Sequence, residues 1–159
     1  IGSRLVGSEM CIRDRSQRMS LDFEGKVAIV TGSGGGIGKG YALELAKRGA
    51  KVVVNDLGGA VDGSGGSLSA AETVVQEIEA AGGEAIANGA NVCSEDDVKN
   101  MVKETMEKWG RVDILINNAG ILRDKSFAKM EWSDFVTVVN VHLLGSALCA
   151  HTVLSLIHI

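Results

Sequence analysis

The segment that decides the fold is Thr31-Gly-Ser-Gly-Gly-Gly-Ile-Gly38. It follows Val27–Thr31, a short run of apolar and β-branched residues that indicates a buried strand. It leads into Gly36–Arg48, where apolar residues recur at helical spacing until Gly49 ends the helix. Glycines let a backbone turn tightly and approach a phosphate without a Cβ, and a helix N-terminus favours negative charge. A glycine run alone is also compatible with a plain turn, but this strand and helix context favours binding of a dinucleotide pyrophosphate.

The rest of the chain repeats the same alternation of strand and helix. Strands are predicted at Lys51–Asn55, Glu84–Asn88 and Val112–Ile116, and helices at Ser69–Ala81, from Ser94 to Gly110, and from about Glu131 to Thr152. Ser94 and Asp97 predict a capping box at the start of the second of these helices. The order βαβαβαβα predicts one α/β domain, a Rossmann-like doubly wound parallel sheet with strand order 3-2-1-4. The predicted sheet stops after its fourth strand and the helix that follows.

Asp56 stands at the end of the second strand, eighteen positions after Gly38. A carboxylate there can accept hydrogen bonds from the adenosine ribose hydroxyls, and it repels a 2′-phosphate. Leu57-Gly58-Gly59 follows it, so no basic residue is available to pair with that phosphate. The pattern favours NAD over NADP as the cofactor. The alternative is a solvated Asp in a turn, which is common after strands.

Composition limits the possible partners. The net charge of −4 and the pI near 5.4 argue against nucleic acid and against an anionic membrane. We find no uninterrupted apolar stretch of membrane-spanning length and no secretory signal, so a cytoplasmic location is expected. Cys11, Cys93 and Cys149 have no metal-binding spacing, which predicts reduced thiols and no metal.

The motif at Thr31–Gly38 together with Asn117-Asn-Ala-Gly120 resembles the short-chain dehydrogenase/reductase family, from Gly25 to about Thr152. The resemblance implies an oxidoreductase with a catalytic Ser, Tyr, Lys and Asn. It implies that the pyrophosphate lies on the glycine-rich loop, the ribose on Asp56, the adenine on Asn91-Val92 and the nicotinamide on Asn118–Gly120. The implied cofactor-binding residues are Gly32, Ser33, Gly36, Ile37, Gly38, Asp56, Asn91, Val92, Asn118, Ala119 and Gly120. Asn117 is expected to brace the central strands. The family has Asp where Asn91 stands, although an amide can still bond a purine edge.

Two finer features resemble the (3R)-hydroxyacyl-CoA dehydrogenase unit of multifunctional β-oxidation enzymes and its bacterial relatives. They are Asn55–Gly59 with the long loop after it, and Asn117–Phe127. The implied substrate is a small molecule, a 3-hydroxyacyl-CoA, with a steroid or an acyl-carrier thioester as alternatives. A non-catalytic dinucleotide-binding module on the same fold stays open. Arg123 and Lys125 are either phosphate contacts for acyl-CoA or solvated loop charges. The resemblance also implies a homo-oligomer, and a peroxisomal location if the source is a eukaryote.

His142 occupies the position of the family's catalytic Asn, three residues before Gly145. It either holds a proton-relay water by its ring nitrogen or packs in the interior as a helix residue. Asn140, two residues earlier, is expected to face elsewhere on an α-helix. The Ser and the Tyr-x-x-x-Lys of the family are missing from the sequence, so this fragment is predicted to be inactive.

The two ends of the chain are expected to be foreign to the domain. Leu5–Asp14 can be encoded as CTC GTG GGC TCG GAG ATG TGT ATA AGA GAC. Leu154–Ile159 can be encoded by a string that contains the reverse complement of the last five of these codons. A single DNA element that resembles a transposon-based sequencing adaptor, read inward from each end, explains both. We therefore expect residues 1–18 and 154–159 to be non-native tails, and residues 19–153 to be the N-terminal part of one NAD-binding Rossmann domain. The alternative is that these are genuine termini.

Overall fold

A four-stranded parallel sheet forms the centre of the molecule. The computed structural model describes residues 21–58 and 69–157. The strands are β1 (Val27–Thr31), β2 (Lys51–Asn55), β3 (Ala85–Asn88) and β4 (Ile114–Ile116). They lie in the order β3-β2-β1-β4, and every pair is parallel. The predicted Rossmann-like fold and its strand order are confirmed, with β3 and β4 slightly shorter than expected.

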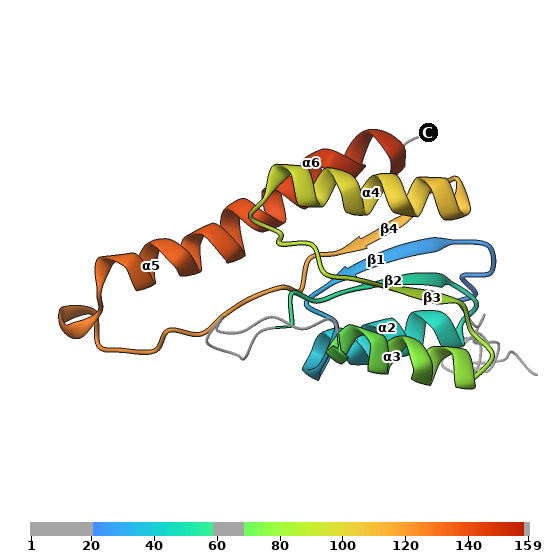
Figure 1. The fold of residues 1–159 in the computed structure, drawn as a ribbon, viewed down its shortest axis with the longest axis horizontal. Helices are drawn as coiled ribbons and strands as arrows, with labels where there is room; N and C mark the ends of the chain where they lie inside the picture. The colour runs from blue at the N-terminus through green and yellow to red at the C-terminus, as the bar shows by residue number, and fades with distance from the viewer. Residues whose placement is uncertain (1–20, 59–68, 158–159) are drawn as a thin grey trace, which may run out of the picture.

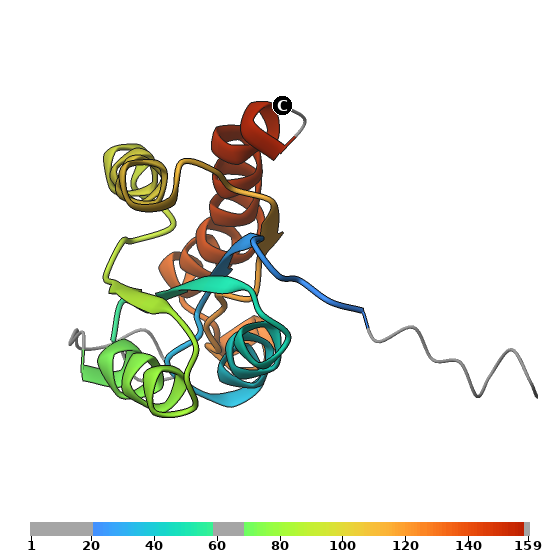
Figure 2. The same ribbon diagram turned by 90° about the vertical axis from the view of Figure 1, so that its right-hand side faces the viewer.

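Helices cover both faces of this sheet. The helices α2 (Gly36–Lys47) and α3 (Ser69–Ala80) lie on one face, while α4 (Glu95–Trp109) and α6 (Ser146–Ile157) lie on the other (Figures 1 and 2). Successive residues of a strand point to opposite faces, so a sheet covered twice needs strands that are apolar throughout. In β1, Ala28 and Val30 pack into the core under α2 and α3, and Ile29 packs into the other core. The continuous apolar runs of the first two strands are explained by these two cores.

The start of α4 differs in one bond from the expected capping box. The Ser94 hydroxyl accepts the backbone N–H of Asp97 at 3.3 Å, as predicted. The Asp97 carboxylate accepts the N–H of Asn91 at 3.0 Å, where a capping box would use the N–H of Ser94. The shorter side chain of Asp therefore ties the helix to the preceding turn at Asn91. At the other end, Gly110 ends α4 in the left-handed conformation, with φ of 72°.

The last helical region is continuous, but it is not a uniform α-helix. It consists of α5 (Trp132–Val139), a π-helical segment (Asn140–Gly145) and α6. A short 3-10 turn, Phe127–Lys129, precedes α5, which projects beyond the end of the sheet (Figure 1). Sequence periodicity predicts a helix here but does not reveal the wider turn in its middle.

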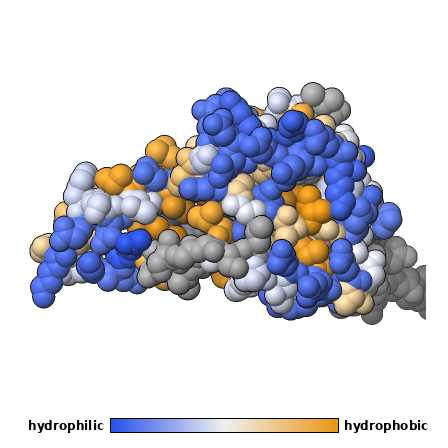
Figure 3. Space-filling view, in the orientation of Figure 1, coloured by the Kyte–Doolittle hydropathy of each residue, from blue (hydrophilic) through white to orange (hydrophobic). Residues whose placement is uncertain are grey.

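Much of this region is apolar and uncovered in the described residues. Leu143 and Leu144 are 63% and 55% exposed, and hydrophobic surface follows the projecting helix in Figure 3. The run Trp132–Ile157 is long and apolar enough to span a membrane by length and composition, with 17% of its most apolar window buried. As expected, the run is not uninterrupted, because Asp134, Asn140 and His142 lie among its Val, Leu and Ala residues. Cys149 and Val153 are nonetheless buried in the core beneath α4.

Two apolar residues of α2 lie outside the core, although their spacing predicts an inward face. Ile37 and Tyr41 are 72% and 47% exposed, whereas Ala42, Leu45 and Ala46 are buried. The sheet covers only one side of the helix, and small residues fill that side. The expectations for residues 1–18 and 158–159, and for most of the loop after Leu57, lie outside the described residues.

Candidate coenzyme site

A cleft of about 450 Å³ opens at the carboxyl ends of β1, β2 and β4. In an open parallel α/β sheet this is the edge where ligands bind. Most of the residues expected to hold the cofactor line it: Gly32, Gly36, Asp56, Asn91, Val92, Asn118, Ala119 and Gly120. The fold therefore brings together four sequence segments that lie up to about ninety positions apart.

Thr31 holds the end of β1 against the segment that follows β4. Its hydroxyl accepts the backbone N–H groups of Asn118 and Ala119 at 3.1 and 3.0 Å, and it donates to the Ile116 carbonyl at 3.3 Å. The Asn118 amide donates to the carbonyls of Thr31 and Gly32 at 3.0 and 2.8 Å. These bonds join the start of the glycine-rich loop to the segment after β4, and both line the cleft.

The brace expected at Asn117 is therefore formed by Asn118. Asn117 is exposed, and its amide donates to the Ser146 carbonyl at 3.2 Å, which ties the segment after β4 to α6. Alternation along an extended chain explains the exchange, because neighbouring side chains point in opposite directions. Thr31, the first residue of the glycine-rich motif, is the sequence signal for this brace, because its hydroxyl binds the segment that contains Asn118.

Glycines permit close approach around this brace. Gly32 has a positive φ of 62°, and a Cβ there would lie 2.8 Å from the Ala119 Cα. A Cβ on Gly38 would press on the Asn118 amide nitrogen and on the Gly32 carbonyl. Gly38 thus serves the packing of α2 against the loop, while Gly32 and Gly36 border the cleft itself.

Four residues of the glycine-rich motif do not line the cleft: Thr31, Ser33, Ile37 and Gly38. The buried Ser33 hydroxyl donates to the Val30 carbonyl at 2.7 Å, so its side chain supports the loop from behind. Ile37 lies in the first turn of α2 with its side chain in the open. Neither side chain is among those that surround the cleft.

Asp56 joins two loops. Its Oδ2 accepts the backbone N–H of Gly34 at 2.8 Å, and its Oδ1 accepts the N–H of Gly58 at 2.7 Å. A carboxylate has about four lone-pair positions, so two remain for ribose hydroxyls. The same carboxylate can therefore fix the loop and bind a ligand.

The turn after β3 forms the far wall. The Asn91 side-chain oxygen accepts the N–H of Cys93 at 2.9 Å, while its amide NH₂ remains available to a purine edge. Val92 is buried and packs against Gly145, where a Cβ would lie 2.9 Å from the Val92 Cγ2. The cleft is also lined by Leu57, Ala70, Ala90, Ile121 and Val141, which sequence analysis missed because small and apolar residues carry no chemical signal.

His142 lies beside Gly120 and Ile121, two residues that line the cleft. Its Nε2 is 3.0 Å from the Ile121 nitrogen and 2.9 Å from the Ile121 oxygen. The ring stacks closely on Gly120, where a Cβ would lie 2.7 Å from the His142 Cε1. His142 is exposed, which contradicts the alternative that it packs in the interior as a helix residue. The π-helical segment places its neighbour Val141 in the lining of the cleft and His142 against Gly120 and Ile121 at the cleft's edge.

Arg123 and Lys125 are held by one acid. Asp134 is buried, and its two oxygens bind Arg123 Nη1 at 2.9 Å and Lys125 Nζ at 3.3 Å. Neither cation is therefore a freely solvated loop charge. Asp134 offsets one of their two positive charges, which weakens the attraction for a phosphate.

The cysteines have no site chemistry in the described part of the chain. Burial, and to a lesser degree the neighbouring Cys93, raises the pKa of Cys149 to about 11, so its thiol stays protonated. No cluster of metal-binding side chains is present among the described residues. Cys149 behaves as a core residue, as expected.

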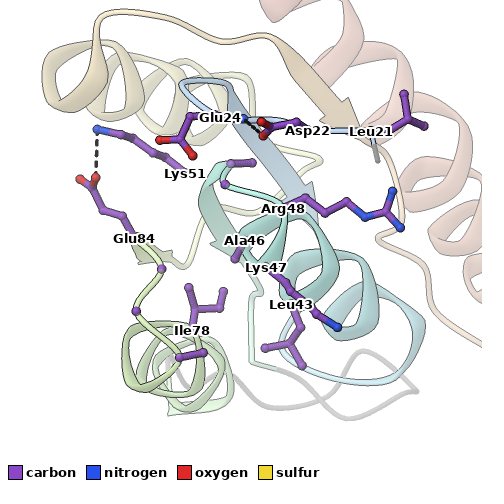
Figure 4. Close-up of a pocket in the computed structure, with 15 residues that line it drawn as sticks. Leu21, Asp22, Glu24, Leu43, Ala46, Lys47, Arg48, Lys51, Ile78 and Glu84 are labelled. Carbon is purple, nitrogen blue, oxygen red and sulfur yellow. Dashed lines mark hydrogen bonds and ion pairs between the residues drawn. The ribbon is translucent and has the colours of Figure 1, made fainter. Parts of the chain in front are cut away.

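A larger hollow of about 830 Å³ lies at the other end of the strands (Figure 4). It is open to solvent between the carboxyl ends of α2 and α3. An ion pair from Lys51 to Glu84 at 2.9 Å crosses its edge. The hollow has no loop N–H groups aimed at a ligand and none of the residues of the family motif. The cleft at the carboxyl ends of the strands therefore has the chemistry of a binding site, although it is the smaller of the two.

Comparison with known proteins agrees with this geometry. Residues 26–158 match the family described as short chain dehydrogenase. The chain belongs to the short-chain dehydrogenase family. It is 59% identical to the peroxisomal multifunctional enzyme A of Dictyostelium discoideum over 128 residues, which is 80% of this chain and 28% of that protein. It is 54% identical to the peroxisomal hydratase-dehydrogenase-epimerase of Saccharomyces cerevisiae, over 79% of this chain and 14% of that protein.

Solved structures of short-chain dehydrogenases have the same fold. A short chain dehydrogenase from Mycobacterium avium superposes with a TM-score of 0.76 at 46% identity, over 84% of this chain and 46% of that one. The resemblance to this family and to multifunctional enzymes is thereby confirmed. The chain spans less than a third of the multifunctional relatives and about half of the solved dehydrogenase.

Proposed function

We propose that this short-chain dehydrogenase chain is the coenzyme-binding part of an enzyme that moves hydride between NAD and a secondary alcohol or ketone. The observation that carries the proposal is the convergence of the glycine-rich loop, Asp56 and Asn118–Gly120 on one cleft. Its volume lies in the range usual for ligand sites. The cleft fits a dinucleotide because Gly32 and Gly36 leave its floor free of side chains, and α2 directs its N-terminus at the loop.

The coenzyme would supply the hydride chemistry, and the chain's own residues would hold it. The loop N–H groups at Gly32–Gly38 receive the pyrophosphate, and Asp56 receives the ribose hydroxyls. Asn91-Val92 adjoins the adenine, and Asn118, Ala119 and Gly120 border the nicotinamide. The fixed negative charge of Asp56 favours NAD over NADP.

His142 is proposed to hold a water for proton transfer. Its Nε2 is engaged by the Ile121 backbone, which leaves Nδ1 for the water in either tautomer. If Nε2 accepts the Ile121 N–H, Nδ1 carries a proton and donates to the water. If Nε2 donates to the Ile121 carbonyl, Nδ1 accepts from the water. The ring is thus a fixed holder for the water in both cases.

The proposed substrate is a 3-hydroxyacyl-CoA. Similarity to multifunctional enzymes of peroxisomes supports it, and the sequence features at Asn55–Gly59 and Asn117–Phe127 fit the same subfamily. A peroxisomal location follows if the source is a eukaryote, and a cytoplasmic one otherwise. We further propose that residues 19–153 belong to a longer domain in a homo-oligomer, with adaptor-derived tails at 1–18 and 154–159.

The test is made on the complete gene product. NAD-linked oxidation of a 3-hydroxyacyl-CoA is measured, and the affinities for NAD and NADP are compared. We expect turnover and tighter binding of NAD. A protein that binds NAD without any turnover would instead be the non-catalytic binding module. Reading source codons 5–14 and 154–159 tests the tails, and codons unrelated to the adaptor string would refute that origin.

A further inference from the structure

The segment between β4 and the 3-10 turn is attached to the last helical region at two points. At the first point, the Nε2 of His142 lies 3.0 Å from the Ile121 nitrogen and 2.9 Å from the Ile121 oxygen. At the second point, the carboxylate of Asp134 binds Arg123 Nη1 at 2.9 Å and Lys125 Nζ at 3.3 Å. The segment therefore runs back along the helical region, from His142 towards the start of α5 (Figure 1).

The two attachments agree in length. Asp134 precedes His142 by eight residues, which corresponds to about 12 Å along a helix. Arg123 and Lys125 follow Ile121 by two and four residues, which corresponds to about 7–14 Å of extended chain. The segment itself contains no helix or strand, so no regular backbone hydrogen bonding fixes its shape. The two attachments together therefore determine where its main chain lies.

Asp134 is the centre of the second attachment. Its side chain is buried between α5 and the segment, with 9% of the residue exposed. Within residues 21–58 and 69–157, Arg123 has no polar partner for its buried Nε, so Asp134 is what holds its guanidinium. Removal of the carboxylate charge would leave two cations side by side, and like charges repel each other. The part of the segment that contains Arg123 and Lys125 would then move away from α5.

We propose that Asp134 is a positioning residue, which holds Arg123 and Lys125 and thereby keeps the Ile121 main chain against His142. The inference rests on the proposed function, in which His142 holds a water for proton transfer. The two oxygens of Asp134 bind cations of the segment, so the effect of Asp134 on the imidazole passes through the main chain. A ring that leaves the Ile121 main chain no longer directs its Nδ1 to one fixed place.

The test uses the complete gene product and the variant Asp134→Asn, which retains the size of the side chain but removes its charge. This variant should lower kcat for NAD-linked alcohol oxidation by about three- to tenfold, because a displaced proton-transfer group is less effective. The KM for NAD should change by less than about twofold, since Asp134 does not line the coenzyme cleft. Asp134→Glu retains the charge and should recover part of kcat. Asp124→Asn, the same change at an exposed acid of the segment, is the matched control and should leave kcat unchanged.

A double-mutant cycle decides whether Asp134 acts through His142. If it does, Asp134→Asn should lower kcat by less than about twofold in the His142→Ala background, because the group that it positions is already absent. Equal fold losses of kcat in both backgrounds would overturn the proposal and leave Asp134 with a structural role alone. If Asp134→Asn does not fold, Arg123→Gln breaks the same attachment from the segment and enters the same cycle.

Crystal structures of the unmodified protein and of Asp134→Asn give a readout besides turnover. In the variant, the His142 ring should lie beyond hydrogen-bond distance of Ile121 or occupy more than one position. A ring that keeps its place would overturn the proposal, whatever the value of kcat. An unmodified protein without turnover would refute the proposed function, and the position of the ring would then decide by itself whether Asp134 positions His142.

Discussion

The imidazole of His142 is bonded to the backbone of Ile121, with Nε2 at 3.0 Å from the nitrogen and 2.9 Å from the oxygen. This bond joins the π-helical segment to the residue that follows the Asn-Ala-Gly motif. The ring is therefore fixed by the main chain and does not depend on a neighbouring side chain.

We expect His142→Ala in the complete gene product to lower turnover by about tenfold or more, a typical effect of losing a proton-transfer group. The melting temperature should change little, because His142 is exposed. His142→Asn retains an amide that can reach the Ile121 backbone and should restore part of the turnover. Normal turnover in His142→Ala would leave His142 without a role in proton transfer.

Gly38→Ala should destabilise the fold, since its Cβ would displace the Asn118 amide from the carbonyls of Thr31 and Gly32. Overpacking of this kind costs about 1–3 kcal/mol. Urea unfolding measures the cost, and NAD affinity should fall in parallel. Gly40→Ala in the same helix is the matched control, because it should be neutral or stabilising by up to about 1 kcal/mol. Equal stability of the two variants would contradict the packing described around Asn118.

Asp113 predicts a specific acid sensitivity. Its hydrogen bonds with Arg111, the Val27 N–H and the charge of Lys26 lower the pKa of Asp113 below its usual value, against partial desolvation. A lowered folded-state pKa stabilises the protein above the unfolded value of about 4, and this contribution disappears as the pH falls through the folded value.

Asp113→Asn should therefore destabilise the protein at neutral pH by about 1 kcal/mol, a modest figure because Arg111 is half exposed. The difference from the unmodified protein should shrink as the pH falls below about 4. Urea unfolding at several pH values measures it, with Asp124→Asn, an exposed acid, as the control. A difference that persists undiminished in acid would exclude this linkage.

Asp134→Ala should loosen the segment after the Asn-Ala-Gly motif. It removes the shared partner of Arg123 and Lys125, and Arg123 Nε is already buried without a hydrogen-bond partner among the described residues. Because both cations retain access to water, we expect a loss of about 2 kcal/mol, less than for a fully buried pair. Thermal unfolding checks this, and Glu131→Gln, an exposed neighbour, should have no effect. An unchanged melting temperature would show that the two ion pairs contribute nothing.

The printed chain alone should catalyse no hydride transfer. Tyr41 is its only Tyr, it lies on α2, and residue 45 is Leu where a Tyr-x-x-x-Lys pair would need Lys.

Residues 19–153 also have an incomplete core. Among the described strands β4 pairs only with β1, and Leu143 and Leu144 are exposed. A few hundred Å² of such apolar exposure removes roughly 5–10 kcal/mol, comparable to the stability of a whole domain. Residues 19–153, expressed alone, should therefore aggregate, and turnover by a compact monomer would refute this expectation.

The sequence predicts the sheet well because strand and helix periods are strong signals in an α/β chain. Val52–Val54 and Val27–Val30 are apolar at every position, which indicates burial on both faces, and the structure confirms it. The site is less fully predictable. Motif positions do not reveal which of two adjacent Asn side chains faces the sheet. The brace expected at Asn117 is therefore found at Asn118. Nor do motif positions reveal that Asp134 on α5 pairs with both Arg123 and Lys125, eleven and nine positions earlier, since ion pairs between a loop and a helix leave no periodic pattern.

The π-helical segment, Asn140–Gly145, divides one continuous helix into two halves with separate phases. Each turn of such a segment contains an extra residue, so the face that α6 applies to the sheet is not the face that α5 would inherit from an unbroken α-helix. The chain can therefore align Val153 with the core and His142 with the cleft at the same time. Deletion of a single residue between 140 and 145 would rotate α5 by about 100° relative to α6, and the side of the helix beside the cleft would no longer be in register with the side that packs in the core.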